Sequence, residues 1–448
     1  MARSNSKPAR RDPLGVDRPR ANLAASRGAF AAVFALIVVL VIVMYAQERW
    51  LAVVSVALFD GGLVVAWVVS AWLLGAAIVR GIGLPLRGAL GFATAAATGM
   101  GAMSLAALGL GLAGTLNRWS VLAILLAGPA LTARWGLGIL RTARTIQVGR
   151  WLAGSAGWRW LLIGAAPMVG MMMVGASITP GLLWKPEDPH PYDALEYHLQ
   201  VPREWFDAGR ITGLHNNVFS YFPSGVEMHF LMAMHLRGGP WAAMYACQFF
   251  SIAWVLLMAA AVYGAVRRDG DAEDGSTAAR TAVASAAAVV VLAAPWSVML
   301  GSVAYAEGGL ALYTGLAAAW MLRAVGRGET RGRAMLVAGA MVGFACGVKY
   351  TAVPMVLLAL GITAVVVALA TRRLREWWKG LLVYSVVAVA VASPWYVRNA
   401  VWTRNPVFPL AMNTLGRAHF DEVQVERFRI AHSPPPAERP LGARLLRA

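Results

Sequence analysis

The densest group of polar side chains that could do chemistry lies in residues 184–211 of an otherwise strongly apolar chain. Within it, Asp193, Glu196 and Tyr197 are three and four residues apart, so they share one face of a short helix. We expect that helix to stop before Pro202, because proline disfavours helical geometry in the residue ahead of it. A carboxylate held there can act as a general base. The spacing also fits an N-cap at Asp193 with Glu196 as its capping-box partner, which is the commoner arrangement, and the two roles are compatible.

A second candidate is Lys349, a single ammonium group between two apolar stretches in the run GFACGVKYTAVPMVLL. Only four of the 40 lysine and arginine residues are lysines, so a lysine at this position departs from the strong preference for arginine in the rest of the chain. Charges at membrane depth face cavities rather than lipid and are functional candidates. An ammonium there suits an anionic group, phosphate above all. The alternative is a lysine that ends a helix by extending to the interface.

A third candidate lies after the last apolar stretch, in SPWYVRNAVWTRNPVFPL. Arg398 could bind phosphate with two parallel hydrogen bonds, where Lys349 would act as a point charge. Trp395 and Tyr396 are typical of the aromatic belt at a membrane interface. Interfacial anchoring is equally open for Arg398.

Metal chemistry has weaker support in the sequence. Glu187 and Asp188, between two prolines, could bind a divalent cation through oxygen, or could be solvated loop residues. The histidines lack HExxH spacing, and the chain has no GxSxG elbow, Walker loop or dinucleotide fingerprint. Cys247 and Cys346 both lie in apolar runs, which argues against a disulfide framework.

Composition defines the class of protein that must position these groups. Hydrophobic residues make up 58% and charged residues 14% of the 448 residues, against about 45–50% and about 25% in a soluble domain. We therefore expect an all-α multi-pass membrane protein. The net charge of +18 then belongs to cytoplasmic loops rather than to a nucleic-acid surface. Residues 1–28 read as a disordered basic cytoplasmic tail before an uncleaved first span.

A membrane helix needs about 20 apolar residues, and eleven stretches reach or approach that length. They are 29–46, 52–79, 89–113, 119–140, 160–180, 240–266, 281–302, 305–323, 335–348, 351–370 and 380–394. With the N-terminus in the cytoplasm, the arginine-rich loops fall inside, at 80–88, 141–159, 267–280, 324–334 and 371–379. Segment 220–236 is left out of the count, because its length and polar residues indicate an amphipathic helix on the membrane surface.

This topology in the plasma (inner) membrane brings separate polar regions to the extracytoplasmic side. The largest is a first outer loop, 181–239, in which we expect short surface helices. Three further sites share that side: Tyr305 with Glu307, then Lys349, then Arg398 with Asn399.

The chain resembles the GT-C class of integral-membrane glycosyltransferases, which includes protein mannosyltransferases and lipid A aminoarabinose transferases. The likeness lies in the order of five blocks over 160–412: YDALEYHLQVPREWFDAGRI, NNVFSYFPSGVEMHFL, AYAEGGLALY, GFACGVKYTAVP and PWYVRNAVWTRNPVFP. Residues 29–159 would then be four additional transmembrane helices, since relatives usually have one span before the catalytic loop and this chain has five. Residues 413–448 would be a polar tail, where many relatives continue with further spans or a soluble domain.

The resemblance implies transfer of a sugar from a polyprenyl-phosphate donor to a glycan, lipid or protein acceptor, with inversion. Asp193 matches the catalytic acidic residue in a D-x-x-x-Y-H pattern, and Lys349 and Arg398 would lie near the lipid phosphate. Glu196 and His198 are the further catalytic candidates. The remaining substrate-binding candidates are Glu307, Tyr197, Tyr221 and Asn399. No cofactor is required, although a divalent cation is compatible.

Two readings from other functional classes stay open. A transporter or lipid flippase would predict internal repeats and broken helices at mid-membrane, and the polar residues here gather on one side instead. A non-catalytic membrane scaffold would tolerate loss of Asp193.

Overall fold

The computed structural model describes residues 23–84, 87–133, 158–183, 192–267, 277–326 and 331–433. Within these ranges all regular structure is helical, as the composition predicts. Six of the described helices are long and apolar enough to cross a membrane, and three shorter apolar helices accompany them. The protein is therefore a helical protein of membrane type, while eleven crossings stay a prediction.

In chain order, the described helices are α1 Leu23–Ala46, α2 Trp50–Val56, α3 Gly62–Gly81, α4 Gly88–Leu112, α5 Arg118–Ala133, α8 Ala166–Ala176, α9 Gln200–Asp207, α10 Glu227–Arg237, α11 Pro240–Arg267, α12 Thr277–Ala293, α13 Pro295–Leu300, α14 Glu307–Gly326, α15 Arg331–Cys346, α16 Ala359–Ala370, α17 Leu374–Thr403, α18 Met412–Leu415 and α19 Glu422–Ala431. Shorter 3₁₀ and π turns are η1 Gln47–Arg49, η2 Ala57–Gly61, η3 Trp158–Ala165, η4 Ala194–His198, η5 Val218–Tyr221 and η6 Val353–Leu358.

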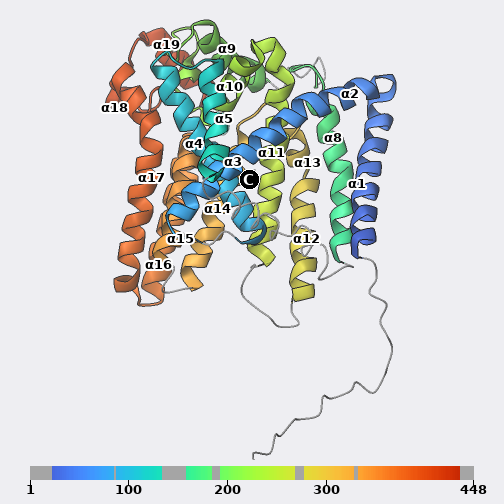
Figure 1. Cartoon of the computed structure of the whole chain (residues 1–448). Helices are drawn as coiled ribbons and strands as arrows, with labels where there is room; N and C mark the ends of the chain where they lie inside the picture. Colours follow the sequence, from blue (N-terminus) through green and yellow to red (C-terminus); the bar gives the residue numbers. More distant parts are fainter. Residues whose placement is uncertain are drawn as a thin grey trace, which may run out of the picture.

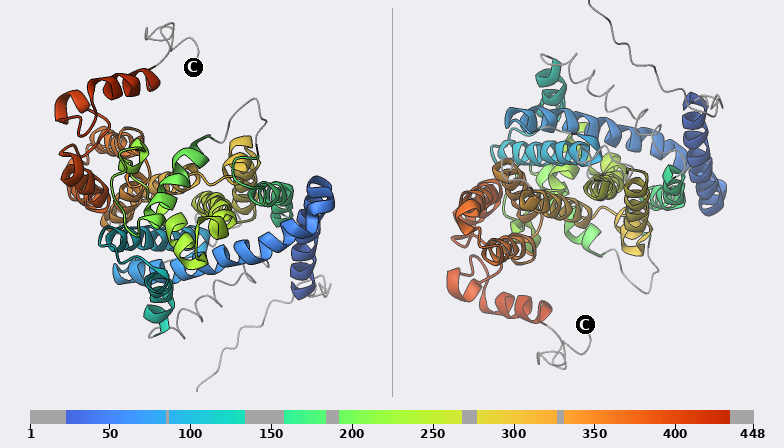
Figure 2. Two further views of the ribbon diagram at one scale, coloured as in Figure 1. Left: turned by 90° about the horizontal axis from the view of Figure 1, so that it is seen from above. Right: turned by 90° about the horizontal axis from the view of Figure 1, so that it is seen from below.

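The long helices stand roughly side by side, and the short helices α9, α10, α18 and α19 gather at one end of the bundle (Figure 1). α11 packs against α4, α12 and α14, and α15 packs against α14 and α17. Seen from above, α1 and α17 lie at opposite edges (Figure 2). The apolar side chains of these edge helices, such as Leu40, Val386 and Val389, are exposed, as lipid contact requires.

The predicted span 380–394 is shorter than α17 at both ends. Three other differences from the predicted boundaries have local causes. α1 begins at Leu23, so the last residues of the expected tail are helical, and residues 1–22 lie outside the described part. Gln47, with φ of 48°, makes the turn between the first two predicted spans. The predicted span 281–302 is two helices, because Ala294 is extended and Pro295 starts α13.

The prediction of a membrane-surface helix at 220–236 is wrong. α10 has only eleven residues, and every residue from Glu227 to Met234 is buried. It packs against α4, α5, α9 and α11 rather than lying on a bilayer. Burial lowers the pKa of His229 to about 3, so this imidazole is neutral at pH 7.

The expected polar tail after residue 412 is partly folded. Asp421 and Gln424 form a capping box that starts α19. His419 stacks on His215 and contacts Tyr221, so this segment covers part of the outer loop. Residues 434–448 lie outside the described part.

Cysteines at the two ends of the bundle test the predicted sidedness. Asn216 is exposed in the loop after α9 and Arg375 is exposed at the start of α17, and these regions lie at opposite ends (Figure 1). With a cytoplasmic N-terminus, Asn216→Cys should react with a membrane-impermeant thiol reagent in intact cells, and Arg375→Cys only after permeabilisation. The native Cys247 and Cys346 are buried, so the unmodified protein is the background control. The reverse labelling pattern would contradict the orientation.

Candidate functional site

Asp193 lies at the start of the π turn η4, and the prediction that it caps this helix is wrong. Its backbone is already helical, and its side chain accepts no capping hydrogen bond from the described backbone. Its Oδ2 instead accepts a hydrogen bond from the Tyr197 hydroxyl at 3.0 Å. Leu199 N bonds Ala194 O five residues back, and this wider turn places the side chains of residues 193, 197 and 198 differently from an α-helix. The prediction that helical structure stops before Pro202 is wrong: η4 ends at His198, but α9 begins at Gln200 and includes Pro202 in its first turn, where proline is tolerated.

The Tyr197 hydroxyl, which donates to Asp193, stays protonated. Burial raises the pKa of Tyr197 far above its usual range, and the negative charges of Asp193 and Glu307 raise it further. Its ring stacks on Phe219 at 4.3 Å between centroids. Asp193 is therefore held in one orientation by a group that stays protonated at any ordinary pH.

His198 pairs with a residue that the sequence analysis did not select. Its Nδ1 lies 2.5 Å from Glu227 Oε1, and the two side chains are 0% and 6% exposed. Glu227 starts α10, so its carboxylate also complements the helix dipole. The two residues are 29 positions apart, and only the fold of the outer loop brings them together. In the sequence, Glu227 could be recognised only as an acidic residue inside an apolar run. That run was predicted to be a surface helix.

Glu307 and Lys349 form an ion pair in which the ammonium donates to Glu307 Oε1. Glu307 opens α14 and Lys349 follows the end of α15, and these two consecutive helices pack against each other. The start of one and the end of the other therefore meet at the same end of the bundle. Each charge is also favoured by the nearer helix dipole. The side chains are 31% and 23% exposed, so a ligand can reach the pair.

A cavity of about 180 Å³ opens beside Lys349. Its lining comes from the outer loop and from the segment after α15: Tyr197, Val201, Phe219, Phe222, Pro223, Ser224, Glu227, Val348, Lys349, Tyr350 and Thr351. The two segments meet where Gly225 N donates to Gly347 O at 2.9 Å. A Cβ on Gly225 would lie 2.8 Å from that oxygen, so the close approach requires glycine.

Arg398, Asn399 and Tyr221 form a separate buried cluster next to this cavity. The Arg398 guanidinium lies over the rings of Trp395 and Trp402, and its Nη2 donates to the Phe222 carbonyl at 3.0 Å. Its Nη1 alone lacks a hydrogen-bond partner among the described residues. In this arrangement Arg398 ties the end of α17 to the outer loop, and little of it is free for phosphate.

Asn399 also links the end of α17 to the outer loop. Its Nδ2 donates to the Tyr221 carbonyl at 2.5 Å and to the Tyr350 hydroxyl at 2.6 Å, and the residue is fully buried. Removing the amide leaves the Tyr221 carbonyl without this donor, so Asn399→Ala should destabilise the protein by about 1–3 kcal/mol. Thermal unfolding of the purified protein in detergent measures this loss, with Asn216→Ala at an exposed position as the matched control. Equal melting temperatures for both variants would contradict the structural role.

The remaining candidates lie apart from this cavity or outside the described residues. Glu196 is exposed; its backbone carbonyl accepts from Asn217, and its side chain hydrogen-bonds Tyr192. Glu187 and Asp188 lie in a segment that the structure does not describe. Among the residues described, no group of three or more His, Cys, Asp or Glu side chains could hold a metal ion.

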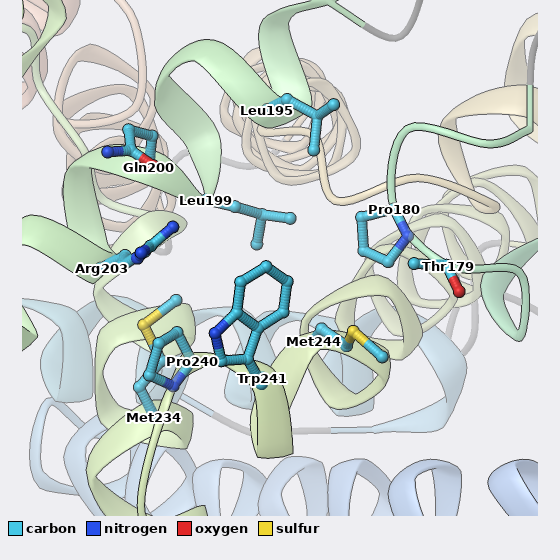
Figure 3. Close-up of a pocket in the computed structure, with 10 residues that line it drawn as sticks. All are labelled: Thr179, Pro180, Leu195, Leu199, Gln200, Arg203, Met234, Pro240, Trp241 and Met244. Atoms are coloured by element: carbon cyan, nitrogen blue, oxygen red, sulfur yellow. The ribbon is translucent and has the colours of Figure 1, made fainter.

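A second pocket of about 100 Å³ lies on another side of η4 (Figure 3). Its walls are mostly apolar, with Leu195, Leu199 and Trp241 facing one another and Arg203 at one side. The guanidinium carbon of Arg203 lies over the Trp241 ring, 5.4 Å from its centroid. None of its ten lining residues is a predicted site residue, so it is distinct from the cavity at Lys349.

Comparison of the chain with protein-family models, with curated proteins and with solved structures finds no match. The candidate site is therefore inferred from its geometry alone. It consists of three side-chain pairs: Asp193 with Tyr197, His198 with Glu227, and Lys349 with Glu307.

Proposed function

We propose that this protein is a membrane glycosyltransferase that moves a sugar from a polyprenyl-phosphate donor to an acceptor on the extracytoplasmic face. One observation carries the proposal. Tyr197, which holds Asp193, lines the same cavity as Lys349. A carboxylate and an ammonium from distant parts of the chain are thus gathered at one end of an apolar bundle, as transfer from an anionic lipid requires.

In the proposed reaction, Asp193 removes the proton of an acceptor hydroxyl as its oxygen attacks the anomeric carbon of the donor sugar. The bond from that carbon to the phosphate oxygen breaks, and the lipid phosphate leaves with the electron pair. Lys349 stabilises the negative charge of the leaving phosphate. We assign this contact to Lys349 rather than to Arg398, because the Arg398 guanidinium already donates to the Phe222 carbonyl of the outer loop and to Asn399 Oδ1.

A lipid substrate is also supported by an apolar groove of about 870 Å³ between α1, α8 and α13. Its lining includes Met168, Met171, Val298 and Ser302. Three residues further on, Tyr305 contacts the ring of His198. A prenyl chain in this groove would have its phosphate end beside the polar centre.

Reconstitution into liposomes tests the proposal. Purified protein is given a polyprenyl-phosphate-linked sugar and a panel of glycan, lipid and peptide acceptors, and sugar transfer is followed by mass spectrometry. Wild-type protein should transfer the sugar, and Asp193→Asn should not. Translocation of the intact donor lipid, equal in wild type and Asp193→Asn, would instead support a flippase and overturn the proposal.

A further inference from the structure

Three buried polar atoms near the cavity have no partner among the described residues: Glu307 Oε2, His198 Nε2 and Glu227 Oε2. The first two, a carboxylate oxygen and an imidazole nitrogen, are of kinds that can pair with each other. Glu307 uses Oε1 to accept from Lys349, while its Oε2 is buried and unpaired. His198 uses Nδ1 to contact Glu227, while its Nε2 is buried and unpaired. A buried group without a hydrogen bond is costly, so such pairs of atoms indicate a second arrangement in which they are used.

Two observations place His198 in the neighbourhood of Glu307. The Tyr305 ring lies 5.2 Å from the His198 ring, and Tyr305 is only two residues from Glu307. His198 also lies within electrostatic range of the Glu307 carboxylate. The other titratable groups that face this centre are Asp193, Tyr197, Glu227, Tyr305 and Lys349.

In the described structure, the group proposed to bind the phosphate is already occupied by another side chain. The ammonium of Lys349, which the proposed function gives to the lipid phosphate, is held by Glu307. A phosphate that takes Lys349 would leave the partly exposed Glu307 carboxylate, whose Oε2 is buried, without a cation, which is unfavourable. The imidazolium form of His198 keeps Nδ1 paired with Glu227 and has a second N–H, on Nε2, that can donate to Glu307 Oε2.

We propose that Glu307 is an exchangeable counterion, which passes from Lys349 to His198 when the phosphate group of a polyprenyl lipid binds. Glu227 holds the imidazolium for this exchange. Before binding, Glu307 is paired with Lys349 and His198 with Glu227. After binding, Lys349 is paired with the phosphate and Glu307 with His198, so neither Lys349 nor Glu307 is left without a partner. This inference rests on the proposed function, since it takes Lys349 as the phosphate ligand.

The test measures lipid binding without catalysis. Native mass spectrometry of the purified protein in detergent compares a polyprenyl monophosphate with the uncharged polyprenol of the same length, and inorganic phosphate is added as a competitor. Glu307→Gln keeps the shape but removes the charge that occupies Lys349, so the phosphate lipid should bind about tenfold more tightly. His198→Asn keeps a donor for Glu227 but has no Nε2, so binding should weaken about tenfold. His198→Gln, which returns an N–H near the Nε2 position, should restore part of this loss.

The double variant decides the mechanism. In the Glu307→Gln background no carboxylate needs a new partner, so adding His198→Asn should have no effect on phosphate-lipid affinity. An undiminished His198→Asn effect in that background, or no tightening in Glu307→Gln, would overturn the counterion exchange. Equal binding of polyprenyl phosphate and polyprenol to wild-type protein would overturn the proposed function itself. Competition by millimolar inorganic phosphate as strong as by the lipid would identify a free phosphate, not the lipid, as the occupant and would contradict the proposal.

Discussion

Replacement of Asp193 by asparagine is expected to slow sugar transfer at least about a hundredfold, because a positioned general base contributes about 10²- to 10⁴-fold in rate. An amide has no useful proton affinity near neutral pH. The fold should survive, since the asparagine oxygen can still accept the hydrogen bond from Tyr197, and no cap is lost. Turnover of purified protein at matched thermal stability is the measurement.

Glu196→Gln is the matched control for this experiment. It removes a carboxylate from the same turn, but from an exposed position, so turnover should change by less than about twofold. Near-normal turnover in Asp193→Asn would show that Asp193 only orders the turn with Tyr197. A large loss in Glu196→Gln instead would move the base to that residue.

Loss of the Lys349 ammonium is expected to weaken donor binding by about 10- to 150-fold, since a hydrogen bond to a charged group contributes about 1.5–3 kcal/mol. Lys349→Met retains the length of the aliphatic chain and removes the charge. Lys349→Arg should also bind less well, because the guanidinium is broader and differently hydrated. Affinity for the polyprenyl-phosphate donor is measured on purified protein.

Two controls separate a lost ligand contact from a damaged site. Lys379→Met removes an exposed lysine near the start of α17, at the end of that helix away from Arg398, and should leave affinity unchanged. Lys349→Met combined with Glu307→Gln avoids a buried unpaired carboxylate, so a persistent loss in this double variant reports on the phosphate contact itself. Unchanged affinity in both Lys349 variants would make the ion pair a purely structural link between α14 and α15.

The positions of the long helices could be predicted from the sequence, because a bilayer demands long uninterrupted apolar segments. The predicted spans 89–113 and 240–266 differ from α4 and α11 by one residue at their ends. The candidates Asp193, His198, Glu307 and Lys349 were also found, because polar groups are rare enough in such a chain to stand out. Their roles remain predictions, but the structure gathers them around one centre.

The partners of those groups depended on the tertiary structure. Spacing favoured a cap at Asp193, and a π turn directed its carboxylate to Tyr197 instead. Arg398 was predicted to bind phosphate or to anchor at the interface, whereas in the structure it is buried over the rings of Trp395 and Trp402. The physical reason is that hydropathy depends on each residue alone and helix capping on neighbours along the chain. Pairs such as His198 with Glu227 depend on packing between segments far apart in sequence, which no local pattern records.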